Sequence, residues 1–377
     1  MASRRPAVSI RSRSRAPERA GARRYPLTGI YLNPIRLLHG AEGRRALLDG
    51  LALPLAGSGI VFAGIEAIRR DRSGRTATIH PVRDGAVAGL PAEAGPGLAR
   101  LQAPRAPFAG LAADRLRLMG ILNVTPDSFS DGGRYLDRDA AIGQAEEMIA
   151  AGAEMIDVGG ESTRPGARPV DIDTELDRVL PAIERLAGGA VPVSIDTRNA
   201  EVMRRAIAAG ASVVNDVSAL SHDAESLDVV AVSNAAVILM HAQGDPRTMQ
   251  QDPRYEDVLL DVYDTLAARV ADCRACGIAP ERIAIDPGIG FGKTPAHNAA
   301  LLDGLAMLHG IGCVLLLGAS RKSFIARLDR DCAPEQRVGG SVAAALCGAA
   351  RGVQWLRVHD VGETRQALAV WRGIGAA

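Results

Sequence analysis

The sequence contains little lysine, few aromatic residues and no long apolar run. Of its 44 basic residues only Lys293 and Lys322 are lysine, and aromatic residues make up 3% of the 377 positions. Hydrophobic residues nevertheless make up 47%, so aliphatic side chains can fill a core of ordinary size. The longest apolar run, residues 311–319, is about half the length that a transmembrane helix needs, which excludes a helical membrane protein.

Charge and cysteine content narrow the class of protein further. The formal net charge of +1 argues against a nucleic-acid partner, because such proteins usually carry a strong basic excess. The five cysteines are odd in number and lie in apolar or helical contexts, so we expect no disulfide framework and a cytoplasmic location. Cys273 and Cys276 form a lone CxxC pair, which favours helix packing over a zinc site.

Three segments follow from composition. Residues 1–24 hold eight arginines and one acidic residue without apolar periodicity, which predicts a disordered tail. Such a segment also resembles a transit peptide, although a bacterial tail or a start codon placed too far upstream fits better. Residues 25–110 predict a small α/β extension of unknown role followed by a linker, and residues 111–377 predict the catalytic domain.

Eight short apolar or β-branched runs recur in the third segment, each followed by a helical pattern. We expect strands at residues 118–124, 155–159, 191–196, 213–217, 236–240, 283–286, 313–317 and 355–358. Eight βα units of this length predict a TIM barrel, of α/β class.

Polar residues end every one of these predicted strands. Because the active sites of such barrels lie at the carboxyl ends of the strands, we expect these groups to converge on one pocket. They are Asn123, Glu161 with Thr163 and Arg164, Asp196, Asn215 with Asp216, His241, Asp286, Arg321 with Lys322, and Arg357 with His359.

Two kinds of chemistry follow from these groups. Arg164, Lys322, Arg357 and His359, beside glycine-rich turns, suit phosphate or diphosphate oxygens, although the arginines could instead pair with carboxylates of the barrel. Carboxylates and an amide together suit the N–H edge of an amino-pyrimidinone, and they could alternatively hold a loosely bound Mg²⁺. Asp286 could also act as a general base.

The segment from Gly290 to Thr294 resembles the end of a phosphate-binding P-loop. The first glycine of that motif would fall at Pro287, however, so the motif is incomplete.

The ordered set of motifs resembles the dihydropteroate synthase family, from residue 115 to residue 374. The motifs are Gly120-Ile-Leu-Asn-Val-Thr-Pro-Asp-Ser-Phe-Ser-Asp-Gly-Gly133, Asp157-Val-Gly-Gly-Glu-Ser-Thr-Arg-Pro-Gly166, Ser194-Ile-Asp-Thr197, Asn215-Asp-Val-Ser218, Leu239-Met-His-Ala-Gln-Gly244, Asp286-Pro-Gly-Ile-Gly-Phe-Gly-Lys293, Ser320-Arg-Lys-Ser323 and Arg357-Val-His-Asp-Val361. Ala242 stands where family members often carry methionine, which affects only local packing.

The resemblance implies a folate-synthesis transferase that is a target of sulfonamides. It would condense 6-hydroxymethyl-7,8-dihydropterin diphosphate with para-aminobenzoate, use Mg²⁺ and form a homodimer through barrel helices away from the active face. Loss of diphosphate leaves a cation delocalised into the pterin, so charge stabilisation matters more than a strong base.

The resemblance also implies a role for individual residues. The catalytic residues would be Asn123, Asp131, Arg164 and Lys322, with Asn123 at the metal. The pterin would contact Asp196, Asn215, Met240, Asp286, Lys322 and Arg357. The diphosphate would contact Asn123, Thr163, Arg164, Arg357 and His359. The aminobenzoate would contact Phe129, Thr163, Pro165, Phe291, Lys322 and Ser323.

Two other functions compete with this interpretation. A methyltetrahydrofolate:corrinoid methyltransferase shares the barrel but is expected to lack the Ser320-Arg-Lys-Ser323 segment. A pterin-binding paralogue without synthase activity would use residues 25–110 as an interaction module. The scarcity of lysine adds a prediction: Lys322→Arg loses most turnover, whereas Lys293→Arg keeps more than half.

Overall fold

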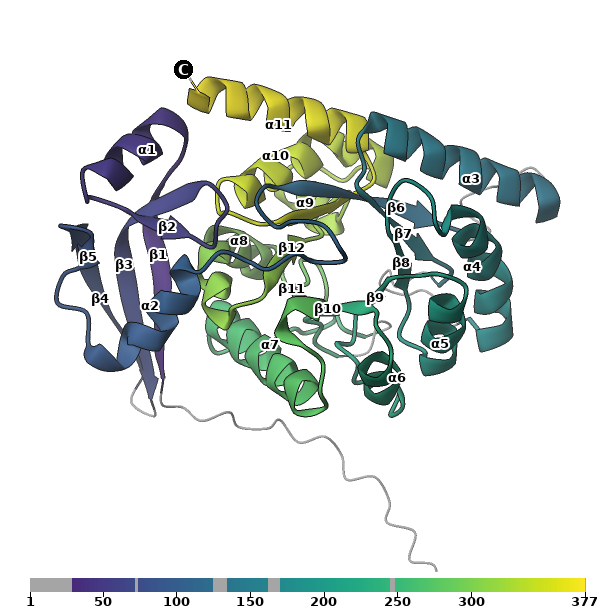
Figure 1. Cartoon of the computed structure of the whole chain (residues 1–377), viewed down its shortest axis with the longest axis horizontal. Coiled ribbons are helices and arrows are strands. Elements are labelled where there is room, and N and C mark those ends of the chain that lie inside the picture. Colours follow the sequence, from purple (N-terminus) through teal and green to yellow (C-terminus); the bar gives the residue numbers. More distant parts are fainter. Residues whose placement is uncertain (1–28, 72–73, 125–133, 162–169, 245–247, 377) are drawn as a thin grey trace, which may run out of the picture.

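A closed barrel of eight parallel strands forms the larger part of the chain, with helices around it (Figure 1). The computed structural model describes residues 29–71, 74–124, 134–161, 170–244 and 248–376. Around the barrel the strands run in the order β10-β11-β12-β13-β6-β7-β8-β9. The predicted TIM barrel is therefore confirmed.

Each predicted barrel strand is present, with ends that shift by at most two residues. The strands are β6 (Arg117–Asn123), β7 (Met155–Gly159), β8 (Val193–Asp196), β9 (Val213–Asp216), β10 (Ala236–Met240), β11 (Ile283–Asp286), β12 (Val314–Leu317) and β13 (Trp355–Val358). The helices are α3 (Arg134–Ala151), α4 (Ile172–Leu186), α5 (Ala200–Ala208), α6 (Ser226–Val232), α7 (Val258–Ala275), α8 (Pro295–Asp303), α9 (Ser323–Leu328), α10 (Val338–Ala349) and α11 (Val361–Ala376). Short 3-10 turns are η3 (Pro280–Arg282), η4 (Leu305–Ile311) and η5 (Pro334–Arg337).

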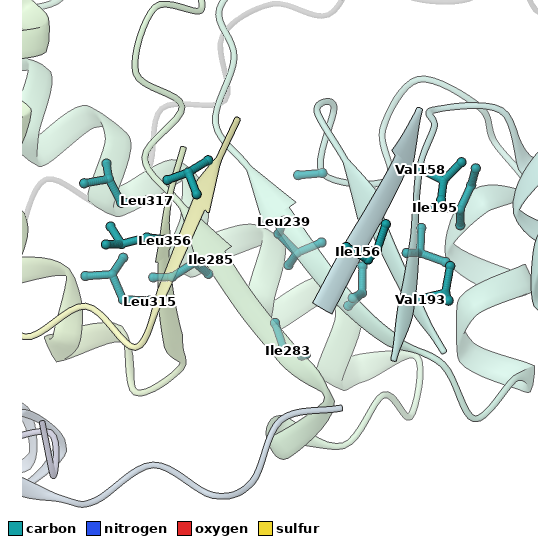
Figure 2. Packing of buried hydrophobic residues seen from close by; sticks show 14 of the residues in the cluster. Ile156, Val158, Val193, Ile195, Leu239, Ile283, Ile285, Leu315, Leu317 and Leu356 are labelled. Carbon is teal, nitrogen blue, oxygen red and sulfur yellow. The ribbon is translucent and has the colours of Figure 1, made fainter. Parts of the chain in front are cut away.

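The main core lies between the strands and the surrounding helices. Alternate strand residues point outward into this layer, where Figure 2 shows Ile156, Val158, Ile195 and Leu239 among the packed side chains. Helix α4 meets them with residues such as Val179, which is fully buried. The two-residue period of a strand and the 3.6-residue period of a helix thus produce one apolar layer.

The other half of each strand faces the inside of the barrel. Met155, Val213, Ile238, Ala284 and Trp355 belong to a separate cluster that fills the interior at the amino ends of the strands. Since side chains alternate along a strand, the inward-facing residue two positions later lies nearer the carboxyl end. The barrel interior is therefore apolar at one end and open to polar residues at the other.

An internal repeat marks the turns that lead from α3 into β7 and from α5 to β9. Gly152 and Gly210 both have φ of +111°, a conformation that favours glycine. Ala153 N donates to Met148 O and Ala211 N donates to Ala206 O, each at 2.8–2.9 Å, so both helices end in the same kind of glycine cap.

The extension that precedes the barrel is a small antiparallel sheet with two helices. Its elements are β1 (Ile30–Leu38), α1 (Gly40–Leu48), β2 (Leu53–Leu55), β3 (Ile60–Asp71), β4 (Gly74–Arg83), β5 (Ala86–Val87), η1 (Ala92–Ala94) and α2 (Gly95–Gln102). Strand β3 lies at the centre, paired with β1, β2 and β4. This is the small α/β appendage that the sequence predicts.

Ion pairs and aromatic contacts fix this sheet against helix α7 of the barrel. Arg70 on β3 is paired with Asp261 and, at 2.6 Å, with Asp264. Tyr31 Oη on β1 donates to the same Asp264 at 2.9–3.0 Å, and its ring meets that of Tyr263 edge-on at 5.5 Å. Below them Ile68, Leu260 and Met307 complete an apolar cluster shared by the two parts.

Three sequence predictions concern the chain as a whole. The predicted tail, residues 1–24, lies outside the described residues. Among the described residues no helix is long and apolar enough to cross a membrane. All five cysteines are free thiols, as expected, and Cys273 is buried in helix packing.

Candidate active site

Six side chains come together inside the barrel at the carboxyl ends of its strands. Five of them lie two residues after an inward-facing residue of the apolar cluster, as Arg357 does after Trp355 and Asn215 after Val213. The sixth, Asp196, pairs in register with Asn215. The six residues are Asp157, Asp196, Asn215, Met240, Asp286 and Arg357.

Arg357 links two of the carboxylates. Its Nε lies 2.6 Å from Asp157 Oδ2 and its Nη2 lies 2.6 Å from Asp196 Oδ2. Burial acts to lower the pKa of Arg357, but the two carboxylates outweigh it and raise the pKa. The sequence left open whether the arginines of the site pair with barrel carboxylates, and Arg357 does so.

Asp157 also fixes the orientation of Asn215. Asn215 Nδ2 donates to Asp157 Oδ2 at 3.0 Å, and because a carboxylate only accepts, the amide oxygen of Asn215 faces the other way. Asp157 is fully buried and was missing from the predicted site residues. The signal for it was present in its motif: it shares the inward parity of Met155 on the same strand.

Asp196 carries an oxygen that lacks a protein partner. Its Oδ1 is buried without a hydrogen bond within the described part of the chain. Burial raises the pKa of Asp196 to about 7, Arg357 opposes the rise, and the charges of Asp157 and Asp216 add to it. The group is placed to accept a proton or an N–H donor from a ligand.

Asp286 and Lys322 are two further titratable side chains of the site, and their charges attract each other. Asp286 Oδ1 accepts from Gly288 N at 2.6 Å, and burial raises its pKa while the charge of Lys322 opposes this. Burial lowers the pKa of Lys322 to about 7, against the attraction of Asp286. Lys322 Nζ donates to Ile289 O at 2.6 Å and lies 4.1 Å from the centre of the Phe291 ring.

Glycine is required where the β11 loop touches the β10 loop. A Cβ on Gly288 (φ +68°) would lie 1.9 Å from His241 O, and one on Gly292 (φ +62°) would lie 2.4 Å from Gln243 O. No side chain fits in that space, so the two loops are in backbone contact along one wall of the site.

Asn123 and His359 lie at the remaining edge. The Asn123 Oδ1 and Asp196 Oδ2 atoms both lie 3.8 Å from where a Cβ of Gly159 would stand, so one small gap separates the three residues. His359 Nδ1 is 3.0 Å from Ser320 Oγ, and its backbone N donates to the same hydroxyl at 3.2 Å, which fixes the ring at the end of β13.

Other polar residues at the strand ends hold loops rather than face the site. Glu161 pairs with Arg198 at 3.1 Å, and Asp216 accepts from the backbone of Ser218 and Leu220. Arg321 pairs with Asp360 at 2.5 Å and His241 contacts Lys293, so the predicted convergence of every strand-end group on one pocket does not hold. The reason is strand alternation: Asp216, next to the inward Asn215, points outward.

Five predicted site residues fall outside the described residues. They are Phe129, Asp131, Thr163, Arg164 and Pro165, which follow β6 and β7 in the sequence. Met240, Phe291 and Ser323 are described: Met240 is buried at the end of β10, and Ser323 is half-buried at the first turn of α9.

Two observations bear on where ligands bind. The described residues contain no group of three or more His, Cys, Asp or Glu that could hold a metal ion. A cavity of about 220 Å³ opens between the extension and the barrel, but Asp114 and Val353 in its lining precede β6 and β13, so it lies at the amino end of the barrel, away from this site.

Comparisons with known proteins identify the family. The family model described as "Pterin binding enzyme" matches residues 119–359. A dihydropteroate synthase of Neisseria meningitidis serogroup B is 46% identical over 267 residues, which cover 70% of this chain and 94% of that protein.

Two solved structures are also similar. A Yersinia pestis dihydropteroate synthase with a sulfonamide drug complex has 45% identity and a TM-score of 0.67, covering 71% of this chain and 97% of that one. The Burkholderia cenocepacia dihydropteroate synthase complexed with 7,8-dihydropteroate has 45% identity and a TM-score of 0.65, covering 71% and 94%. The extension before residue 111 precedes the family match.

Proposed function

The chain belongs to the pterin-binding enzyme family and, within it, to the dihydropteroate synthases, and from this premise we propose which residues carry out its reaction. The enzyme is a transferase that condenses 6-hydroxymethyl-7,8-dihydropterin diphosphate with para-aminobenzoate to give 7,8-dihydropteroate and pyrophosphate. The methyltransferase alternative is set aside, because the relatives that match over the barrel are synthases.

The pterin ring binds inside the barrel between two carboxylates and an amide. The single observation that carries this assignment is the buried, unpartnered Oδ1 of Asp196, since an acceptor left bare in a protein interior calls for a donor. Asp286 supplies a second acceptor, and Asn215 presents its amide oxygen because Asp157 holds its nitrogen. Met240 lines the slot, and Lys322 donates to the ring.

The diphosphate lies at the edge formed by Asn123, Arg357 and His359, to which the family resemblance adds Thr163 and Arg164. The C–O bond between the pterin methylene and the diphosphate breaks, and the electron pair leaves with the diphosphate. Cationic donors that neutralise this charge lower the barrier, while the carbon cation is delocalised into the pterin.

Mg²⁺ fits this edge as a partner of the diphosphate. An amide oxygen beside a carboxylate is a donor set that suits a hard cation, and Mg²⁺ in phosphate sites usually takes only one or two protein ligands, so a larger cluster is not needed. Asn123 would hold the ion, which when bound neutralises charge on the leaving group.

Aminobenzoate binds above the pterin, against Phe291, Lys322 and Ser323. The neutral amine attacks the methylene carbon, a C–N bond forms, and the amine proton is lost to solvent or diphosphate. The resemblance adds Phe129, Thr163 and Pro165 to this pocket, and adds Asp131 as the group that stabilises the cation and Arg164 as a further catalytic cation. No covalent enzyme intermediate is needed.

Pyrophosphate release tests the assignment. Purified protein receives the pterin diphosphate and Mg²⁺, with and without aminobenzoate and with and without a sulfonamide. We expect release that requires aminobenzoate and is competed by the drug. Pterin binding without release would instead support the paralogue that lacks synthase activity.

The assembly and location are further proposals. We expect a homodimer formed by barrel helices away from the catalytic end, other than α7, which the extension covers. The free thiols fit the reducing cytoplasm. Light scattering of the full chain measures the assembly, and a monomer at micromolar concentration would contradict it.

A further inference from the structure

Lys293 is the second of the two lysines, and the reaction described above does not use it. It lies in the loop between β11 and α8 and is 1% exposed, which is rare for a lysine. A buried lysine in a chain whose other basic residues are nearly all arginine indicates a site that needs a compact donor. Both lysines of the chain donate to backbone carbonyls of the loop after β11.

The Lys293 amine joins two loops that come from different strands. Its Nζ lies 2.9 Å from His241 Nδ1 and 3.2 Å from His241 O on the β10 loop, and 3.0 Å from Phe291 O on its own loop. The nitrogen therefore has three hydrogen-bonding partners, two carbonyl acceptors and one imidazole nitrogen. Burial and the nearby charge of Lys322 both lower the pKa of Lys293.

A second bond supports the same loop from outside. Tyr255 Oη donates to Gly292 O at 2.8 Å, and the Tyr255 ring lies 6.0 Å from that of His241. Lys293 and Tyr255 therefore hold the two carbonyls that flank the position where Gly292 turns through a positive φ. The backbone on either side of Gly292, directly after Phe291, is fixed at both points.

The loop that is held in this way positions the catalytic lysine. Its Ile289 carbonyl accepts from Lys322 Nζ, and its Phe291 ring faces the same amine at 4.1 Å. An added Cβ on Gly290 would lie 3.0 Å from Lys322 Cδ, so the loop also contacts the lysine stem. A shift of the loop would displace both the ring and the amine.

We propose that Lys293 is a positioning residue for aminobenzoate: by tying Phe291 O to His241, it fixes the wall of the aminobenzoate pocket formed by Phe291 and Lys322. This inference rests on the assignment of Phe291 to aminobenzoate. It also replaces the sequence-based expectation for Lys293→Arg, because a guanidinium is larger and cannot fit the buried point-donor position.

The decisive experiment compares Lys293→Met with Gln354→Met. Methionine matches the stem of the lysine side chain as far as Cε and removes the amine. Gln354 is also 1% exposed and bonded to backbone, but it precedes β13 at the amino end of the barrel. We expect Lys293→Met to raise the KM for aminobenzoate at least tenfold. The Kd of the pterin diphosphate should stay within twofold of the parent, because Asp196, Asn215 and Arg357 hold the pterin from other strands. Gln354→Met lowers the Tm and leaves both values unchanged.

A double-mutant cycle with Phe291→Ala separates the proposal from its premise. If Phe291→Ala leaves the aminobenzoate KM unchanged, the assignment of Phe291 fails. If it raises that KM, Lys293→Met should add less than twofold in the Phe291→Ala background, because both changes disturb one wall. Effects that multiply fully, or an equal rise in both substrate constants, would overturn the role of Lys293.

Tyr255→Phe guards against a Lys293→Met variant that does not fold. It removes the bond to Gly292 O without leaving a charged group unpartnered. We expect a smaller rise of the aminobenzoate KM, about twofold to fivefold, again with the pterin Kd unchanged. An unchanged KM for aminobenzoate in this variant would count against the proposal.

Discussion

Arg357 Nη2 and Asp196 Oδ2 lie 2.6 Å apart across the inside of the barrel, although 161 residues separate them in the sequence. The same guanidinium reaches Asp157 through Nε. One planar side chain thus sets the positions of a carboxylate that accepts from the pterin and of another that orients Asn215. A lysine in its place has a single ammonium group on a flexible stem and could not hold both carboxylates in these positions.

Arg357→Lys is therefore expected to weaken binding of the pterin diphosphate at least tenfold, as measured by isothermal titration calorimetry. Arg282→Lys is the matched control. Arg282 donates to the backbone carbonyls of Val230 and Ala235, which precede β10 and lie away from the carboxyl ends of the strands. It should lower the Tm and leave the pterin Kd within twofold. Equal binding losses in the two variants would contradict the role given to Arg357.

The pH dependence of pterin binding follows from Asp196 and Lys322. The pKa of Asp196 is raised to about 7, so the carboxylate that accepts from the ring is gained as pH rises through 7. The pKa of Lys322 is lowered to about 7, so its charged donor form is lost as pH rises through the same range. We expect a bell-shaped affinity with its maximum near pH 7.

The measurement uses a dihydropterin alcohol, which lacks the diphosphate and its own titration. Asp196→Asn should remove the acidic limb of the bell and keep the alkaline limb. A constant affinity between pH 5.5 and 8.5 in the parent enzyme would contradict these protonation states.

Lys322→Arg should lose most turnover, since the guanidinium must displace either the Ile289 carbonyl contact or the Phe291 ring. We expect kcat to fall at least tenfold in the pyrophosphate assay. Arg321→Lys, which alters the neighbouring residue and keeps one bond to Asp360, should retain more than half of kcat. Near-normal turnover of Lys322→Arg would contradict the inference that this position needs lysine rather than arginine.

The extension is expected to stabilise the barrel without contributing to the active site. Arg70 is 11% exposed in its side chain and serves two carboxylates of α7, so Arg70→Ala leaves them uncompensated and should cost about 3 kcal/mol of unfolding free energy. Arg69→Ala breaks an exposed pair with Glu93 and should change the unfolding free energy far less than Arg70→Ala does. Chemical denaturation measures both, and the pterin Kd should stay within twofold in each.

Arg70→Ala with the stability of the parent would mean that the sheet is held by the apolar cluster around Ile68 alone. A large loss of pterin affinity in that variant would instead connect the extension to the catalytic end.

The barrel and most of its site could be predicted because both follow from local periodicity. A polar residue at the carboxyl end of a predicted strand identified Asp196, Asn215 and Asp286. The inward parity of Asp157 was available in the same way, but the partners of Asp157 and Lys293 were not. Those partners lie on distant strands or loops, and local sequence does not record which residue lies opposite.

The same limit explains the polar strand ends that do not face the site. Arg321 and Asp360 each lie next to a predicted site residue, and only the packing of the β12 loop against the β13 loop shows that they bond to each other. The extension was predicted as an α/β unit, but its attachment to α7 depends on Tyr31 and Arg70 meeting carboxylates that lie 233 and 191 residues further along the chain.

The backbone contact at Gly288 and Gly292 limits how this enzyme can evolve under drug selection. A substitution that adds bulk to the wall of the pocket is one physical route by which a competitor of aminobenzoate would be excluded. At these two positions even a methyl group would collide with a carbonyl of the β10 loop. Lineages that become resistant while remaining catalytic must therefore acquire their changes elsewhere in the pocket.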